Sequence, residues 1–256
     1  MCELLGISSK EILSATPLLD AFYQHSIAHP HGWGLAVFYG SGVSVEKEPV
    51  RALDSRYLQS RLSRDVKCSA LLAHIRYATI GRIEYANCHP FVWDDKSGRT
   101  WTLVHNGTLF EGGPTKDFLE CQEGSTDSER LLLYIVSRMN AEYRGQEPPE
   151  EHRRFLIMDE IIHRLAPGNK LNLLVWDGEN LYVHTNCRGT MYRWQDENKI
   201  LFATKPLLFD GWIPVKRNQL LVCRDGKQIW SGRAHSWDFR EEEVDMTSLF
   251  SAYSEL

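Results

Sequence analysis

The chain has 256 residues of ordinary composition, enough for one large domain or two small ones. Its formal net charge of -5 includes no long run of like charges, which argues against a nucleic-acid face or a basic membrane-binding patch. No apolar run reaches the roughly 18 residues of a membrane span, and the 6 cysteines form no C-x-x-C pair. We therefore expect a single cytoplasmic domain, residues 1–256, with small-molecule or protein partners, no disulfide framework, no metal and no cofactor.

The opening stretch, Met1-Cys2-Glu3-Leu4-Leu5-Gly6-Ile7, has the apolar character of a buried strand. If Met1 is removed, Cys2 carries both a thiol and a free α-amine, which are a nucleophile and a base on one residue. Taken alone, these residues also fit a plain strand that happens to have cysteine in second place.

The next elements alternate helices and strands. Thr16-Pro17 predicts a helix with Thr16 as its N-cap and Pro17 at its first position. An apolar run predicts a buried strand over 35–39, a second helix is expected over 54–62, and another strand over 69–78 ends in polar groups. Arg76, Tyr77 and Thr79 lie at or just beyond that end.

The middle of the chain contains two long helices. Trp101–His105 is a predicted strand that stops at Asn106-Gly107, the dipeptide that most readily adopts the positive φ of a tight turn. Thr126-Asp127-Ser128-Glu129 matches the capping box and predicts a helix. A second helix is expected from about 150 to 165, and short strands follow from 170 onward. This order predicts an α+β layered domain with strands joined mostly as hairpins, and an acidic tail, about 238–256, that is partly loose.

Four separated patches carry the candidate chemistry: Cys2, Arg76, Asn106-Gly107 and Asp127. Each also has a structural explanation. Arg76 could pair with a surface acid, Asn106-Gly107 could be only a turn, and Asp127 could only favour the positive end of its helix. Their order and context are what make the combination specific.

From Cys2 onward the chain resembles the class II glutamine amidotransferases of the N-terminal nucleophile hydrolase superfamily. The resemblance covers roughly the first 140 residues, and it is closest to the small standalone bacterial members. It lies in the following motifs: Cys2-Glu3-Leu4-Leu5-Gly6, Gly32-Trp33-Gly34, Arg76-Tyr77-Ala78-Thr79, Asn87-Cys88-His89-Pro90, His105-Asn106-Gly107 and Thr126-Asp127-Ser128-Glu129.

The resemblance implies a four-layer αββα sandwich with two antiparallel sheets, with the nucleophile at the start of an inner strand. It implies that Asn106 and Gly107 form an oxyanion hole, that Asp127 binds the α-ammonium of glutamine, and that Arg76 binds the α-carboxylate. Tyr77 and Thr79 are expected to line the same pocket. The chain departs from the synthase-linked members, which usually have tryptophan and histidine where it has Tyr77 and Ile80.

Three functions follow from these residues. The first is hydrolysis of the γ-carboxamide of glutamine, or of a γ-glutamyl conjugate, through Cys2 and a γ-glutamyl thioester. The second is a glutaminase subunit that supplies ammonia to a separate synthase, and the third is a non-catalytic glutamine-binding or scaffolding module. A homo-oligomer stays open, and His31, His74, His89 and His105 are expected to be hydrogen-bonded core or loop residues.

Overall fold

The computed structural model describes residues 2–40, 42–78, 81–143 and 147–240. No helix within these ranges is long and apolar enough to cross a membrane. Thr79 and Ile80 lie outside the described residues, as do residues 241–256, which make up most of the tail predicted to be loose. The start of that tail is attached to the domain. Asp238 forms an ion pair with Arg217 at 2.7 Å, and the Phe239 N–H donates to the carbonyl of Asn186.

The first sheet contains the N-terminal strand near its centre. All its pairs are antiparallel, and its order within the described residues is β11-β9-β10-β1-β4-β2-β3. The strands are β1 (Glu3–Ser14), β2 (Trp33–Tyr39), β3 (Gly42–Glu48), β4 (Lys67–Ile75), β9 (Tyr192–Gln195), β10 (Lys199–Ala203) and β11 (Ile213–Pro214).

The second sheet is also antiparallel throughout, with the order β13-β12-β8-β7-β6-β5 in the described part of the chain. Its strands are β5 (Phe91–Asp94), β6 (Thr100–His105), β7 (Leu173–Trp176), β8 (Leu181–His184), β12 (Leu221–Arg224) and β13 (Lys227–Ser231). As expected, neighbours in sequence such as β7 and β8 form hairpins.

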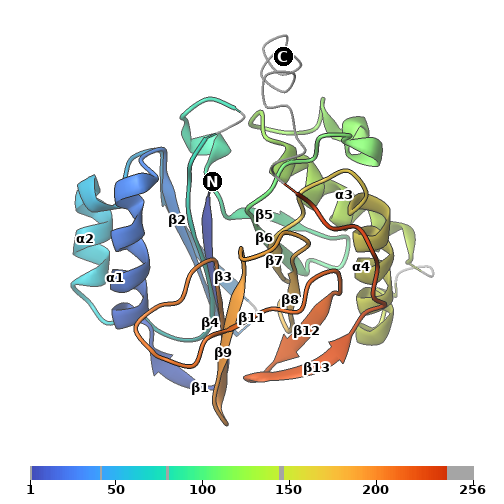
Figure 1. The fold of residues 1–256 in the computed structure, drawn as a ribbon. Coiled ribbons are helices and arrows are strands. Elements are labelled where there is room, and N and C mark those ends of the chain that lie inside the picture. The colour runs from blue at the N-terminus through green and yellow to red at the C-terminus, as the bar shows by residue number, and fades with distance from the viewer. Residues whose placement is uncertain (1, 41, 79–80, 144–146, 241–256) are drawn as a thin grey trace.

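The α-helices cover the outer faces of the two sheets (Figure 1). They are α1 (Thr16–Gln24), α2 (Arg56–Leu62), α3 (Asp127–Ala141) and α4 (Glu151–Leu165). Four 3-10 turns accompany them in the described ranges, namely η1 (His25–Ala28), η2 (Ala52–Asp54), η3 (Tyr85–Asn87) and η4 (Gly113–Phe118).

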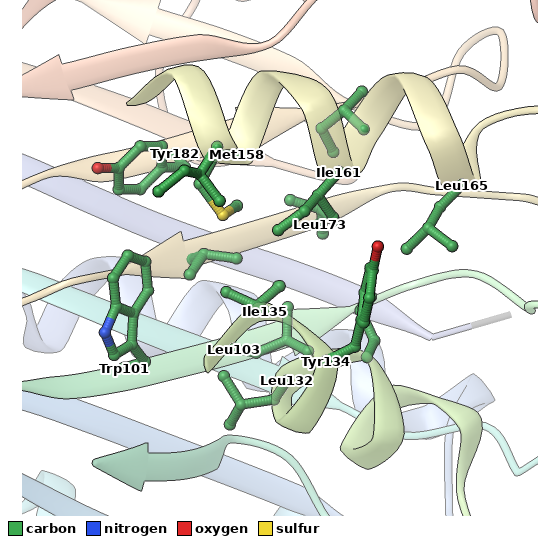
Figure 2. Packing of buried hydrophobic residues seen from close by; sticks show 14 of the residues in the cluster. Trp101, Leu103, Leu132, Tyr134, Ile135, Met158, Ile161, Leu165, Leu173 and Tyr182 are labelled. Atoms are coloured by element: carbon green, nitrogen blue, oxygen red, sulfur yellow. The ribbon is translucent and has the colours of Figure 1, made fainter. Parts of the chain in front are cut away.

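Three hydrophobic clusters fill the spaces between the four layers. One joins α1 and α2 to the first sheet through residues such as Phe22 and Trp33, and another joins the sheets through residues such as Leu4 and Val104. The third packs α3 and α4 on the second sheet, where Trp101 and Leu103 face Ile135 and Met158 (Figure 2). This arrangement confirms the predicted αββα sandwich.

Two predicted helix starts are wrong in detail. Ala15, not Thr16, is the N-cap of α1, because the Thr16 hydroxyl accepts the N–H of Val66 at 2.9 Å instead. The helix expected from residue 54 begins at Arg56, where the Oγ of Ser55 accepts the N–H of Leu58.

The capping interaction at Thr126 is confirmed, since its hydroxyl accepts the Glu129 N–H at 3.3 Å. The Glu129 carboxylate does not complete the box. It accepts the N–H groups of Glu123 and Gly124 at 2.7 and 2.9 Å, and so ties the preceding loop to the helix.

Candidate active site

Cys2 lies directly before β1, opposite the end of β4. The register pairs Glu3 with Ile75, so the chain that continues past Ile75 runs beside Cys2. The N–H of Tyr77 donates to Cys2 Sγ at 3.3 Å, and the thiol is 3.5 Å from the carbonyl oxygen of Tyr77. The backbone of Tyr77 therefore offers both a hydrogen-bond donor and an acceptor to the Cys2 sulfur.

The environment of the sulfur contains opposing influences on its ionisation. Burial raises the pKa of the Cys2 thiol above its ordinary value, while the Tyr77 N–H and the positive charges of Arg76 and Lys170 act to lower it. Lys170 is a buried lysine that the sequence patterns did not single out. Burial is the larger effect, so it favours the protonated thiol, and the N–H group and the nearby cations reduce that shift.

Glu3, next to Cys2, is the centre of a buried ionic cluster. Alternate residues of a strand face opposite sides, so the Glu3 carboxylate points away from the Cys2 side chain, toward the helical layer. It lies 2.7 Å from His25 Nδ1, 2.5 Å from Lys205 Nζ and 3.8 Å from His29 Nε2. Sequence reasoning missed this cluster, and a carboxylate inside an apolar strand was its only signal.

Arg76 is 3% exposed and comes directly after β4. Its guanidinium donates to the carbonyl oxygens of Arg82 at 2.9 Å and Gly81 at 3.4 Å. Burial lowers the pKa of Arg76, and the neighbouring Cys2, Cys88 and Glu84 oppose that effect. The planar group thus stabilises the loop that follows it and lies within electrostatic reach of the sulfur.

Asn106 and Gly107 extend β6 rather than turning. The Asn106 N–H donates to the Asn172 carbonyl at 2.8 Å, and Thr108 and Lys170 exchange two backbone hydrogen bonds of 3.0 and 3.1 Å. Gly107 has no positive φ, so the predicted tight turn is wrong. Glycine is required for another reason: a Cβ would lie 2.0 Å from the Lys170 carbonyl oxygen and 2.2 Å from His105 Nε2.

Two hydrogen-bond donors of this extension, the Gly107 N–H and the Asn106 side-chain amide, are not used by the neighbouring segment 170–172. Antiparallel pairing alternates, so when Asn106 and Thr108 bond to one side, the Gly107 N–H points to the other. On that side β5 no longer pairs, because its first residue Phe91 is opposite Leu103. The Asn106 Nδ2 is buried and has no hydrogen-bond partner among the described residues.

Asp127 begins α3 and is 4% exposed. Its Oδ2 accepts the Leu109 N–H at 2.7 Å, which attaches the end of the β6 extension to the helix. A carboxylate in the first turn is stabilised by the helix dipole.

Two of the four histidines near the motifs are hydrogen-bonded, as expected. His105 Nε2 lies 3.3 Å from the Lys170 carbonyl oxygen, and its Nδ1 lies 3.0 Å from Ser128 Oγ. His31 Nδ1 accepts the Ala78 N–H at 2.9 Å.

The other two histidines do not follow that expectation. His74 and His89 stack with ring centroids 4.1 Å apart, and none of their ring nitrogens has a hydrogen-bond partner in the described part of the chain. Burial lowers the pKa of each well below the usual value.

The predicted site residues therefore form two groups at one end of the sandwich. Cys2 contacts the Arg76-Tyr77 segment, and Asn106-Gly107 is joined to Asp127 through Leu109. Lys170 connects the groups, since its backbone pairs with Thr108 and its charge acts on Cys2. The Tyr77 side chain is 41% exposed, so its backbone provides the contact to Cys2. Within the described ranges, no three His, Cys, Asp or Glu side chains are placed to hold a metal ion.

Comparisons with known proteins agree on one family. Residues 1–193 match the family model described as glutamine amidotransferases class-II. The uncharacterized protein MJ1515 of Methanocaldococcus jannaschii is 30% identical over 267 residues, covering 91% of this chain and 72% of that protein.

Solved structures share the fold. One is the crystal structure of a Pseudomonas aeruginosa protein described as a predicted glutamine amidotransferase. It superposes with a TM-score of 0.64 at 21% identity, covering 90% of this chain and 100% of that one. The glutamine phosphoribosylpyrophosphate amidotransferase of Bacillus subtilis gives a TM-score of 0.67 at 20% identity, covering 91% of this chain and 49% of that one.

Proposed function

Because this chain belongs to the class-II glutamine amidotransferases, we propose that it cleaves the γ-carboxamide of glutamine or of a γ-glutamyl conjugate and releases ammonia or an amine. The observation that carries the proposal is the buried Nδ2 of Asn106, which has no hydrogen-bond partner among the described residues. It lies beside a Gly107 N–H that points away from the neighbouring strand. Two such donors suit an oxygen that gains negative charge.

Cys2 is the nucleophile. Removal of Met1 exposes its α-amine, which titrates near 7.7 to 8.0 in model compounds and so is partly neutral at pH 7. The amine accepts the thiol proton, and the thiolate attacks the γ-carbonyl carbon. The amine then gives that proton to the leaving nitrogen, and water hydrolyses the γ-glutamyl thioester to γ-carboxylate and free thiol.

Asn106 and Gly107 stabilise the tetrahedral intermediates. The carbonyl oxygen becomes an oxyanion during attack, and fixed N–H donors lower the barrier because they need no reorganisation. One such donor contributes about 3 to 4 kcal/mol. The backbone pairing of Asn106 and Thr108 holds these donors in place.

Arg76 and Asp127 recognise the amino-acid end of the substrate. A guanidinium binds a carboxylate through two parallel hydrogen bonds, and a carboxylate complements an ammonium group. Arg76 pairs with the α-carboxylate and Asp127 with the α-ammonium. Thr79 is proposed as a further pocket residue on sequence grounds alone.

The test is ammonia release from glutamine and a panel of γ-glutamyl amides, with Cys2→Ala as the control and intact mass to establish loss of Met1. The expected result is turnover of at least one substrate by the processed protein and none by Cys2→Ala. Full activity in protein that retains Met1 would exclude the α-amine as base. Normal cellular function in Cys2→Ala would favour a non-catalytic binding module.

A second candidate is an ammonia-supplying subunit. It is favoured by the likeness of this chain's fold to that of the Bacillus subtilis glutamine phosphoribosylpyrophosphate amidotransferase. Under this alternative the isolated chain hydrolyses glutamine weakly, and its rate rises on addition of a synthase partner. Strong activity of the isolated protein, with no partner recovered from cells, would contradict it.

A further inference from the structure

Tyr77 is the residue whose backbone touches the Cys2 sulfur, and its position depends on its neighbours. It follows the last β4 residue, Ile75, by two positions and so lies beyond the sheet. Its N–H can stabilise a thiolate at 3.3 Å only while the segment 76–78 keeps its path past Cys2.

His31 holds that segment on both sides of Tyr77. Its backbone N–H donates to the Arg76 carbonyl at 3.1 Å, and its Nδ1 accepts the Ala78 N–H at 2.9 Å. A nitrogen that accepts a hydrogen bond carries no proton, so the ring proton is on Nε2. Burial and the charge of Arg76 lower the pKa of His31, which keeps Nδ1 available as an acceptor.

The ring of His31 also packs on the ring of Tyr77, with centroids 5.1 Å apart. The Tyr77 ring also contacts the His29 ring, with centroids 6.3 Å apart, and His29 Nε2 lies 3.8 Å from the Glu3 carboxylate of the ionic cluster. Ring packing and hydrogen bonding at His31 are therefore separate contributions, and substitutions can separate them.

We propose that His31 is a positioning residue for the nucleophile: its Nδ1 holds the Ala78 N–H, and this fixes the Tyr77 N–H against the Cys2 sulfur so that the thiolate is stabilised. The inference rests on the proposed role of Cys2. His31 does not touch the substrate or the reacting sulfur, and it acts through residues 77–78.

Two substitutions distinguish the hydrogen bond from the ring. His31→Asn places Oδ1 where Nδ1 was and keeps the acceptor without the ring, whereas His31→Phe keeps a ring against Tyr77 without an acceptor. The readout is the rate of Cys2 alkylation by iodoacetamide from pH 6 to 11, followed by mass spectrometry of the N-terminal peptide. Cys121, which is exposed, is the internal reference in the same sample.

We expect His31→Phe to slow Cys2 alkylation at pH 7 about tenfold and to move its pH midpoint upward, which corresponds to a thiol pKa about one unit higher. His31→Asn should stay within about twofold of the unsubstituted protein, and Cys121 should react alike in all three. Thermal midpoints of both variants establish that each is folded.

Equal rates for His31→Phe and the unsubstituted protein would overturn the inference, and so would equal slowing in both variants. The alkylation assay needs no substrate, so it is independent of the proposed function. If the His31 pattern appears but no γ-glutamyl amide is hydrolysed, the proposed function fails while the positioning role stands. If ammonia is released but the pattern is absent, only the positioning role fails.

Discussion

The two segments that bear the candidate site, residues 76–78 after β4 and residues 106–109 after β6, are held in different ways. The second is fixed by backbone hydrogen bonds to Lys170 and Asn172. The first lies beyond the sheet and depends on side chains, since His31 accepts the Ala78 N–H and the Arg76 guanidinium donates to loop carbonyls. The proposed oxyanion donors are thus part of a sheet extension, whereas the proposed substrate-binding segment depends on individual side chains.

That difference has consequences for which substitutions each segment tolerates. Backbone pairing leaves no room for a side chain at Gly107, where the Lys170 carbonyl oxygen would be 2.0 Å from a Cβ. A segment held by side chains can change its residues more freely.

The largest effect is expected from Gly107→Ala. The added methyl group would force the β6 extension away from Lys170 and His105, displacing the donors, and kcat should fall about 1,000-fold, as for loss of one oxyanion donor. Steady-state ammonia release measures this. Gly42→Ala is the matched control, because its Cβ would meet only the Tyr39 carbonyl oxygen at an ordinary 3.7 Å. Comparable losses in both variants would contradict the steric explanation.

Arg76→Lys tests the segment held by side chains. A lysine ammonium lacks the planar set of donors of a guanidinium, so it cannot bind a carboxylate through two parallel hydrogen bonds. It also cannot donate to the Arg82 and Gly81 carbonyls at the same time. We expect kcat/KM for glutamine to fall about 100-fold, mainly through KM, in line with losses at buried charge pairs. Arg82→Lys is the control, since the contact uses only its backbone carbonyl, and a similar loss there would argue against a role for the Arg76 fork.

Asp127→Asn removes charge but keeps an acceptor for the Leu109 N–H. The β6 extension should stay in place, so KM for glutamine should rise about tenfold with little change in kcat, as expected for the loss of one charged hydrogen bond. The decisive comparison is a substrate that lacks the α-amino group. Its KM should be nearly the same for the unsubstituted protein and the Asp127→Asn variant, and an equal rise for both substrates would refute charge recognition.

The smallest effect concerns the pH dependence of stability, through the stacked pair His74 and His89. The pKa of each is well below 6.5 in the folded protein, so as pH falls below 6.5 the unfolded chain binds protons that the folded chain does not, and stability decreases. Between pH 7 and 5.5 each histidine should cost about 1 kcal/mol.

Urea unfolding at several pH values measures this, with His89→Phe compared to the original protein. Between pH 7 and 5.5, the free energy of unfolding of His89→Phe should fall by about 1 kcal/mol less than that of the original protein. His152→Gln, which removes an exposed histidine outside the pair, is the control for the loss of one imidazole, and its effect should be smaller than that of His89→Phe. If His89→Phe had the same pH dependence of stability as the original protein, the stacked pair would not contribute to the loss of stability on acidification.

The sequence predicted the fold class and drew attention to the residues that meet at the site. Local patterns identified the strand ends and the Thr126 cap, and the motif resemblance related Cys2 to Asn106 and Asp127. What it missed depends on contacts between distant segments. The Glu3–Lys205 ion pair, the charge of Lys170 near Cys2 and the stacking of His74 on His89 have no local signature.

The expectation that Asn106-Gly107 adopts the positive φ of a tight turn failed for a related reason. A glycine is needed both for positive φ and for close approach of another chain segment, and sequence alone does not separate these uses. Here the second applies, because residue 170 lies against Gly107. The same limit applied to His31, whose partner Ala78 is distant in sequence.

The sheet order also bears on how the chain can be divided. The family match ends at residue 193, yet β10 (Lys199–Ala203) pairs with β1, and β12 (Leu221–Arg224) pairs with β8. A shortened protein ending at residue 193 would leave two apolar strands with bare edges, one of them immediately after Cys2, and such edges promote aggregation. We therefore propose that residues 2–240 form one indivisible folding unit, in which the segment with the weaker family signature covers the edge of the strand that follows Cys2.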